Sequence, residues 1–551
     1  MQHRFSVWAA IALSLSSCVQ FAATADNPLT SPFDLVPDFR TPKNFAFVAT
    51  TGGSSHVNWV LSIMNDLGNR GHNVTFFTED DHIKFAKPYP NINVVSFGPP
   101  KFNPKEFIQE TSHLDPIMMA QIVIGAFSGV YEPEYRTYND LFATQLYDVV
   151  VCDHFASPCQ DAARSNNIPF VVTMSSALTP DASAPYINND PFTIAEGGSL
   201  QMSFIRRFYV KFILPLRVYW NMSPVIKDLQ KTKDALKVKP YDPMNPWKDS
   251  LKLINNVFGI ESPRPMGSLV ELVGPIIPKR HNGLTPELLD FLNSHQRVAY
   301  VAFGQHAIPS KEDVQTVLTA LTEAMEDGVL DGFVWSTVVS GDRFPSSITT
   351  SRNTTFSMDD MARQAHPHAW LMKWCPQVAL LQHPSTVMFV SHGGLGSLHE
   401  SLYAGKRLLV YPFFGDQPSN GLQAKYTGYG DVLDYRQPQH VNNELLKRVA
   451  ADVDGSIQRT VERYQALVQI HSERGIQRGA DLLEEVAFVH QNGLLPHRYE
   501  DARQMSWIKA NNIDLYGVLF LCFAATIMGL RQAFLAITHK PLVSVAKAKT
   551  L

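Results

Sequence analysis

The sequence predicts an α/β fold with two doubly wound domains, each built on a parallel sheet. Short apolar runs alternate with helix-like stretches in both halves of the chain, and this alternation is typical of parallel sheets. A stretch rich in proline and glycine, residues 274–286, separates the halves. The length of 551 residues also favours more than one domain. We therefore expect one domain at residues 40–275 and a second at 290–470.

The first half begins with an apolar run at 45–49 that suits a strand buried on both faces. The turn Gly52-Gly53-Ser54-Ser55-His56 follows, and then a helix to about residue 71. Further strands are predicted at 74–77, 92–96, 149–152 and 170–173, with a helix starting near Pro158. In the second half, strands are predicted at 298–303, 333–338, 387–390 and 408–411.

The segment 374–420 carries the clearest functional signal. The run at 387–390 ends at His392-Gly393-Gly394, and a helix-like stretch with Gly396 and Ser397 follows. Glycines let a backbone approach closely, and a helix start directs N–H groups and a positive dipole end at an anion. The order strand, glycine turn, helix therefore predicts a diphosphate site, with His392 and Ser397 as further donors.

Four other side chains of this segment complete a nucleotide pocket. Glu400 can accept hydrogen bonds from a ribose diol, and Trp374 offers a flat face on which a base can stack. Asp416 and Gln417 follow the run at 408–411 and suit sugar hydroxyls. Taken singly, each has an ordinary explanation: a core tryptophan, a strand-to-helix turn, a turn or cap residue. The combination in this order favours the pocket.

The segment resembles the signature of the UDP-glycosyltransferases, the glucuronosyl and glucosyl transferase family. The family pattern runs W-x-P-Q, H-P, H-G-G-x-N-S-x-x-E, G-x-P and D-Q-x-x-N. The matching residues are Trp374, Pro376, Gln377, His383, Pro384, His392, Gly393, Gly394, Ser397, Glu400, Asp416, Gln417 and Asn420.

The resemblance implies a GT-B fold, two Rossmann-like domains facing a cleft, and specific roles in donor binding. Trp374 would stack on uracil and Gln377 would contact the uridine. His392 and Ser397, in the turn with Gly394 and Gly396, would bind the diphosphate. Glu400 would bind the ribose, and Asp416 with Gln417 the sugar. The family needs no metal, so no cofactor is expected beyond the UDP-sugar donor.

Three motifs depart from the family pattern. Gly396 replaces an asparagine, so one amide donor to phosphate is lost. The family's G-x-P reads Gly405-Lys406-Arg407, and its Ser-Phe-Gly-Ser turn, which includes Gly304, reads Ala302-Phe303-Gly304-Gln305. Diphosphate binding should therefore depend more on backbone amides than on side chains.

Sugar transfer to a hydroxyl needs a base, and imidazole titrates near neutral pH. His56 follows the first strand and Asp153 ends another strand of the same predicted sheet. A carboxylate can fix the imidazole tautomer and stabilise its charged form. The pair matches the family's catalytic histidine and aspartate. His154 and His82 are rival bases, although His154 should point away from Asp153 if the strand continues.

The two ends of the chain resemble targeting and membrane-anchoring segments. Residues 1–25 read as a secretory signal peptide: a basic start, an apolar core and a small-x-small cleavage site. Residues 513–537 are long and apolar enough to cross a bilayer, and the basic tail 538–551 should lie in the cytosol. Buried core helices are the alternative reading of both segments. The last five residues resemble a K-x-K-x-x retrieval signal. Together these features predict a single-pass endoplasmic reticulum protein with its catalytic domains in the lumen.

The cysteines and the asparagine sequons bear on the lumenal assignment. Of the five cysteines, Cys152, Cys159 and Cys375 lie outside the two apolar ends. At most one disulfide can form among them, and we expect free, buried thiols. Among three N-glycosylation sequons, Asn353 is the best candidate, because Asn73 falls in a strand predicted to be buried.

Two further segments are predicted to be helical. Residues 201–220 are apolar and aromatic with four cations. They could lie on a membrane surface, or pack over the acceptor pocket or the core. Residues 471–500 resemble the family's last helices, which cross back to the first domain.

The expected function is inverting transfer of a hexose from a UDP-sugar, UDP-glucose first, to a small lipophilic hydroxyl compound. The alternatives are a UDP-glucuronosyltransferase and a non-catalytic lumenal protein that binds UDP-sugar or lipophiles. With a net charge of −4, no broad basic surface argues for nucleic acid. A homo-oligomer remains open, and the residues that select the acceptor, within 100–240, carry no legible motif.

Overall fold

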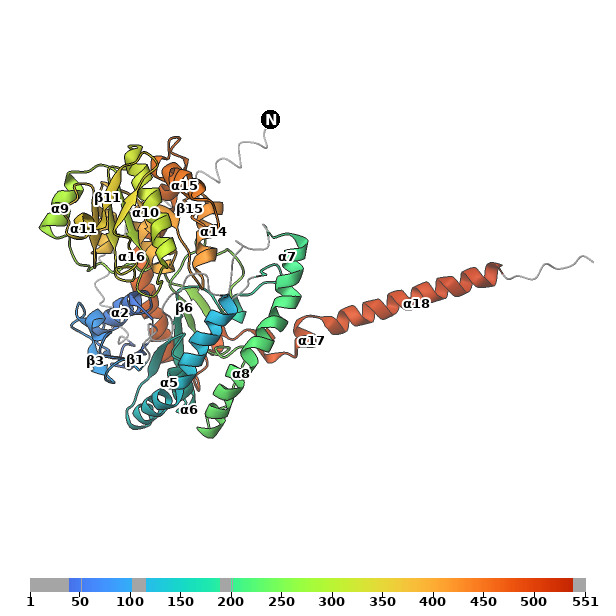
Figure 1. Cartoon of the computed structure of the whole chain (residues 1–551). Coiled ribbons are helices and arrows are strands. Elements are labelled where there is room, and N and C mark those ends of the chain that lie inside the picture. The colour runs from blue at the N-terminus through green and yellow to red at the C-terminus, as the bar shows by residue number, and fades with distance from the viewer. Residues whose placement is uncertain (1–38, 51, 102–114, 189–199, 201, 539–551) are drawn as a thin grey trace, which may run out of the picture. The chain divides into compact units, whose positions relative to one another are not determined.

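The computed structural model describes residues 39–50, 52–101, 115–188, 200 and 202–538. The predicted signal peptide and the retrieval-like tail lie outside the described residues. The chain forms two α/β domains, as predicted, each around a parallel sheet (Figure 1). In Figure 1 the first sheet runs in blue to green and the second in yellow to orange.

The first sheet has seven parallel strands in the order β3-β2-β1-β4-β5-β6-β7. Its central strands are nearly all buried hydrophobic residues, because helices cover both faces of a parallel sheet. The five predicted strands agree with β1, β2, β3, β4 and β5 to within one residue, whereas β6 and β7 were not predicted. The bounds are β1 Asn44–Val48, β2 Asn73–Thr78, β3 Asn93–Ser96, β4 Val149–Asp153, β5 Phe170–Met174, β6 Lys252–Ile254 and β7 Val270–Leu272.

The first domain carries its helices mainly between β1 and β6. They are α2 Ser54–Asn69, α3 Ile83–Ala86, α5 Pro116–Thr144, α6 Ser157–Ser165, α7 Phe204–Phe208 and α8 Leu214–Ala235, with a π-helical turn η2 Tyr209–Ile213 joining α7 to α8. Asn73, placed in a buried strand by the sequence, is exposed at the first position of β2. Asn353 is also exposed, as expected.

The second sheet has six parallel strands in the order β12-β9-β8-β13-β14-β15. No helix or strand lies at 274–285, where the linker is predicted. The strands are β8 Val298–Ala302, β9 Gly332–Ser336, β12 Ala369–Met372, β13 Thr386–Ser391, β14 Arg407–Val410 and β15 Gly430–Val432, and a separate hairpin pairs β10 Ser347–Thr349 with β11 Thr355–Ser357. The helices are α9 Pro286–Asn293, α10 Lys311–Glu326, α11 Met358–Ala362, α12 Gln377–Gln382, α13 Leu395–Tyr403, α14 Gln417–Thr427 and α15 Gln439–Ala451.

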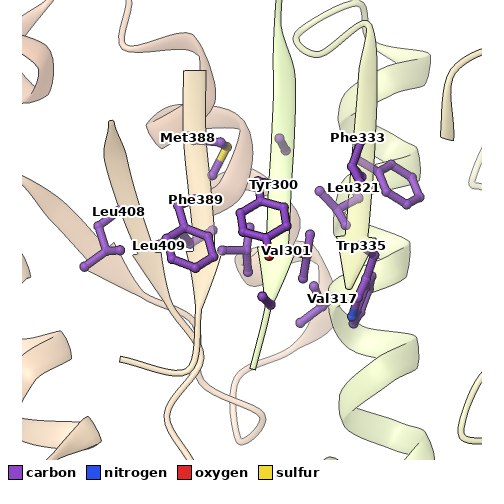
Figure 2. Close-up of a cluster of buried hydrophobic side chains, with 14 of the residues drawn as sticks. Tyr300, Val301, Val317, Leu321, Phe333, Trp335, Met388, Phe389, Leu408 and Leu409 are labelled. Atoms are coloured by element: carbon purple, nitrogen blue, oxygen red, sulfur yellow. The ribbon is translucent and has the colours of Figure 1, made fainter. Parts of the chain in front are cut away.

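The core of the second domain is packed between this sheet and α10 (Figure 2). Strand register places Tyr300 of β8 beside Phe389 of β13, and their rings stack at 5.0 Å. Each fully buried side chain of this size contributes roughly 1.5–3 kcal/mol. The Tyr300 hydroxyl reaches Gln377 at 3.3 Å, so the core directly supports one predicted donor residue.

A single long helix, α16 Ser456–Val489, connects the two domains. Near its start, Gln458 donates to the Gly405 carbonyl of the second domain. Near its end, Glu484 holds Arg70 and His72 of the first domain, at 2.5 and 3.0 Å. The crossing therefore begins about fifteen residues earlier than the predicted 471–500 segment, since one helix can bridge a domain-sized distance. Only short helical turns, η3 Pro496–Arg498 and η4 Asp501–Gln504, follow it before α17.

The chain then reaches α17 Trp507–Ala510 and α18 Ile513–Thr538. α18 has 26 residues, a mean hydropathy of 2.0 in its most apolar window, and no buried residue. It is long and apolar enough to cross a membrane, and it matches the predicted 513–537 segment.

Candidate functional site

The first half of the site lies where the order of the first sheet reverses, between β1 and β4. β1 is hydrogen-bonded to β4 on one side and to β2 on the other, with Val48 beside Cys152. His56 stands in the first turn of α2, directly after β1, and Asp153 is the last residue of β4. Ligands bind at such a switch point in doubly wound sheets.

His56 and Asp153 form a close pair. His56 Nδ1 lies 3.0 Å from Asp153 Oδ2, and the two side chains are 18% and 2% exposed. Burial would lower the pKa of His56, but the charge and hydrogen bond of Asp153 outweigh it, and the charge of Asp416 adds to them. The pKa of His56 is therefore raised above 6.5. With Nδ1 donating to Asp153, Nε2 is the nitrogen that can accept a proton.

Asp153 is kept ionised although it is buried. Burial alone would raise its pKa, but the charges of His56 and His154 hold that pKa well below its usual range. The Phe155 N–H also donates to Asp153 Oδ1 at 3.0 Å. A carboxylate that is held by two imidazoles and a backbone amide can stabilise a protonated His56.

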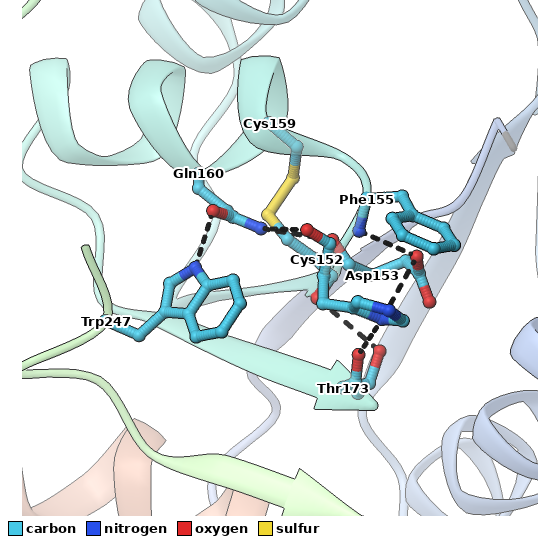
Figure 3. The surroundings of a disulfide bond; sticks show 8 residues. Cys152, Asp153, Phe155, Cys159, Gln160, Thr173 and Trp247 are labelled. Atoms are coloured by element: carbon cyan, nitrogen blue, oxygen red, sulfur yellow. Dashed lines mark hydrogen bonds and ion pairs between the residues drawn. A yellow bond between two sulfur atoms is a disulfide. The ribbon is translucent and has the colours of Figure 1, made fainter. Parts of the chain in front are cut away.

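A disulfide joins Cys152 and Cys159 beside this carboxylate (Figure 3), so the expectation of free thiols at these two positions is wrong. α6 folds back over the end of β4 and brings the two Cα atoms to 6.0 Å, which suits a disulfide. Gln160 donates to the Asp153 carbonyl and accepts from Trp247, which fixes the same turn. Cys375 is free and buried, as expected.

His154 lies on the same side as His56, not on the opposite side. The strand ends at Asp153, so the alternation of side chains stops there, and the two imidazoles stack with centroids 5.3 Å apart. His154 Nδ1 is 3.2 Å from the Thr173 carbonyl. The other rival, His82, packs behind the turn with Nε2 at 2.8 Å from the Gly52 carbonyl. His56 is thus the imidazole best paired with Asp153.

The second half of the site lies at the matching reversal of the second sheet, between β8 and β13. Gly304 follows β8, and His392 follows β13. The two glycines around His392 cannot carry a side chain. A Cβ at Gly304, where φ is +69°, would lie 2.9 Å from the imidazole, and one at Gly394 would lie 2.4 Å from it. These glycines let the ring sit against the backbone at the start of α13.

The chemistry of His392 suits an uncharged donor to an anion. Burial lowers the pKa of His392 to about 4, so it is neutral near pH 7. Its Nδ1 is buried without a hydrogen-bond partner among the described residues. Gly396 and Ser397 occupy the first turn of α13, where backbone N–H groups have no partner within the helix. His392 and these amides can hold a diphosphate together.

A hydrogen-bonded cluster gathers the residues assigned to the nucleoside. Gln377 donates to Glu400 at 2.7 Å and to the Ser397 hydroxyl at 3.2 Å. Burial raises the pKa of Glu400 to about 7. Trp374 follows β12 and is 55% exposed, which is unusual for so large an apolar ring and leaves a face for stacking. The structure therefore brings Gln377, Ser397 and Glu400 together, and Trp374 lies three residues before Gln377.

Asp416 and Gln417 lie at the start of α14, after β14. Asp416 accepts from Asn420 at 2.8 Å, and Asn420 also donates to the Gly393 carbonyl. Burial raises the pKa of Asp416. The Gln417 side-chain carbonyl accepts from the Phe413 and Phe414 amides, so it also shapes the turn. The amide nitrogen of Gln417 is the part suited to a sugar hydroxyl.

The two halves meet around the turn that carries His56. Asp416, from the second domain, is close enough for its charge to raise the pKa of His56. A Cβ at Gly396 would lie 3.0 Å from the Ser55 Cβ, and one at Gly53 would lie 3.2 Å from the Gln305 side chain. Two departures from the family pattern, Gly396 and Gln305, thus lie against this one turn. The small residue at 396 leaves room for Ser55.

Two residues near the site were not singled out from the sequence. His306 follows Gln305 and lies close enough to His392 to lower its pKa, which makes it a further candidate for the diphosphate. Phe155 stacks on His56 at 5.2 Å and is 40% exposed. Their nearness in the sequence to Gly304 and Asp153 is the signal that could have found them.

Comparisons with known proteins show the family and the fold of the chain. Residues 47–548 match the family described as UDP-glucoronosyl and UDP-glucosyl transferase. A UDP-glycosyltransferase of Talaromyces amestolkiae is 28% identical, over 88% of this chain and 96% of that protein. UDP-glucuronosyltransferase 2B19 of Macaca fascicularis is 24% identical, over 69% and 68%. The crystal structure of the glycotransferase of kitacinnamycin aligns with a TM-score of 0.57 at 17% identity, over 81% of this chain and 98% of that one.

Replacing Trp374 by alanine should weaken UDP binding by roughly 1–3 kcal/mol, the range for loss of one stacked base. The measurement is UDP affinity by calorimetry. Trp220, which is also exposed but lies on α8, is the matched control, and Trp220→Ala should leave the affinity unchanged. Unchanged UDP affinity in Trp374→Ala would remove this residue from the donor site.

The affinity for UDP-glucose should fall as pH drops from 8 to 6. Glu400 must be ionised to accept from both ribose hydroxyls, and its pKa of about 7 means that the protonated form accumulates below neutral pH. UDP-glucose is the right ligand because its diphosphate does not titrate in this range. Glu400→Gln should bind more weakly and lose the Glu400 part of this pH dependence. An identical pH profile in the two proteins would contradict the ribose assignment.

Proposed function

Because the chain belongs to the UDP-glucoronosyl and UDP-glucosyl transferase family, whose members transfer sugar from UDP-sugars, we propose that it is an inverting hexosyltransferase with His56 as its base. The observation that carries this proposal is the His56–Asp153 pair at 3.0 Å, set across from the diphosphate turn at His392. Neither half of the site would achieve transfer alone.

The reaction we infer is a single displacement. His56 Nε2 takes the proton of the acceptor hydroxyl while the oxygen attacks the anomeric carbon from the side opposite UDP. The bond from the anomeric carbon to the diphosphate oxygen breaks, and UDP leaves with the electron pair. Asp153 stabilises the protonated His56, and Asp416 adds to this. His392 and the first turn of α13 stabilise the negative charge on the leaving diphosphate.

UDP-glucose is the donor we favour over UDP-glucuronate. A glucuronate carboxylate calls for a cation near the sugar, and Lys373 and Arg407 flank the motif. Arg407 begins β14, at the end of the strand away from the site, and its guanidinium donates to the Val387 carbonyl. That position argues against Arg407 as a partner for the sugar. Lys373 is exposed and directly precedes Trp374, the residue to which we assign uracil stacking, so we place it nearer the base than the sugar.

The acceptor we propose is a small lipophilic hydroxyl compound. Phe155 stacks on His56 and packs against Phe127 of α5, with ring centroids 5.5 Å apart. These rings form an apolar wall beside the base, and a planar or lipophilic acceptor would pack against that wall. A non-catalytic binding protein would not need the buried, ionised carboxylate at Asp153, so the assembled pair favours the enzyme.

We place the catalytic domains in the endoplasmic reticulum lumen, anchored by α18. The Cys152–Cys159 disulfide supports a lumenal site, because structural disulfides persist in oxidising compartments. α18 supports the anchor by its length and composition. The basic tail after it supports a cytosolic C-terminus.

We propose that transfer needs no metal. His56, Asp153 and His154 have ligand atoms within 4.8 Å of one another and could bind an ion. An ion there would occupy the base and its carboxylate, so added Zn²⁺ should inhibit. Transfer should be unchanged by EDTA. Loss of activity in EDTA with recovery on adding Mn²⁺ or Mg²⁺ would contradict the metal-free reaction.

Replacing His56 by alanine should reduce transfer by roughly 10²–10⁴-fold, the usual contribution of a general base, while UDP affinity stays nearly unchanged. The measurement is UDP release with UDP-glucose over a panel of phenols and sterols, alongside UDP calorimetry. His154→Phe keeps a ring against His56 and should retain most activity. Full activity in His56→Ala, or a loss confined to His154→Phe, would overturn the assignment.

A further inference from the structure

The segment from α7 through η2 into α8 carries a continuous row of exposed apolar side chains. Five of them, Phe204, Phe208, Phe212, Leu216 and Trp220, recur every four residues, so each lies next to the following one on the surface of the helical rod. We define the outer stripe as the exposed apolar side chains of this rod, whose exposed fractions lie between 44% and 79%. They are Phe204, Ile205, Phe208, Phe212, Ile213, Leu216, Tyr219 and Trp220.

The outer stripe is not the face by which this rod packs on the protein. Val210, Leu214 and Met222 are the buried apolar residues of the rod, and they form a small core with Ile117 of α5. The rod therefore has two apolar sides. One packs against α5, and the other faces the outside of the described structure. An exposed apolar row of this length marks an interaction surface.

The charges around the stripe fit a lipid surface. Residues 204–220 contain Arg206, Arg207, Lys211 and Arg217 and no acidic residue, although Arg217 pairs with Asp115 at 3.3 Å. Long cationic side chains can lay their stems on apolar surface and reach lipid phosphates with their charged ends. Tyr219 and Trp220 belong to the residue types that prefer the boundary between lipid and water. This composition is typical of a helix lying in the plane of a membrane interface.

The same domain is also held close to the start of α18. Arg503, in η4, forms an ion pair with Asp181 at 2.9 Å and donates to the Lys248 carbonyl. About ten residues separate Arg503 from α18, a span of at most ~35 Å even when fully extended. On the way, Trp507 and Ile508 of α17 are exposed as well. If α18 crosses a bilayer, that bilayer lies within reach of this domain.

We propose that the outer stripe is a second membrane contact, embedded in the lumenal interface of the bilayer that α18 spans. The inference rests on the anchoring assigned to α18 under the proposed function. With two contacts, the first domain is held against the lipid surface and not merely tethered to it. α5 then links the surface to the base, since it packs on the rod near Ile117 and touches Phe155 through Phe127. Lipophilic acceptors concentrated in the bilayer would enter from that side.

The test uses the full-length protein in phosphatidylcholine vesicles, with Cys522→Ser as background and single cysteines labelled with bimane. The label stands at Phe212→Cys on the outer stripe, at Lys231→Cys on the exposed polar part of the same helix, or at Leu519→Cys in α18. The background without an added cysteine measures any labelling of Cys18 and of the buried Cys375. Quenching by lipids with a doxyl spin label near the headgroup reports lipid contact.

The proposal predicts loss of emission at residues 212 and 519 and none at 231. Quenching at 519 without quenching at 212 would overturn the second contact and leave the anchor intact. A blue shift at 212 without lipid quenching would show a second copy of the chain on the stripe, and would also overturn it. No quenching at 519 would overturn the anchor, and the stripe proposal with it.

Discussion

Each of the two parallel sheets reverses its strand order once, and the site depends on these two reversals. At a reversal, neighbouring strands send their following helices to opposite faces of the sheet, so a crevice opens at the strand ends. In the first sheet β1 and β4 flank the crevice and carry His56 and Asp153. In the second sheet β8 and β13 flank it and carry Gly304 and His392. The residues proposed as base and as anion site thus follow the same topological feature, which occurs once in each sheet.

At these two strand ends, glycines allow side chains to pack closely against the backbone, and one buried carboxylate pairs with the proposed base. Gly304 and Gly394 leave room for the His392 ring, and Gly396 leaves room for Ser55 across the domain boundary. Asp153 stays ionised because two imidazoles surround it, and its turn is closed by the Cys152–Cys159 disulfide. The cost of burying this carboxylate is offset first by His56 and further by His154 and the Phe155 amide, so the first half of the site is preorganised before substrate binds.

The sequence predicted what short-range patterns determine. Apolar runs located most central strands to within two residues, and the residues after them proved to be those brought together at the strand ends. Sequence-based prediction failed where the outcome depends on three-dimensional detail that the residue pattern does not encode. The disulfide needed the fold-back of α6, and the side on which His154 lies needed the exact end of β4. The fit of Gly396 against Ser55 depends on the other domain, which no local pattern encodes.

The most direct test of a single displacement between these two half-sites is the configuration of the product. UDP-glucose carries an α-linked sugar, and attack from the side opposite UDP, with His56 as base, inverts the anomeric carbon. Proton NMR of the glycoside at early times should therefore show only the β-anomer. An α-linked product would require a different geometry of attack and would contradict the base assigned to His56.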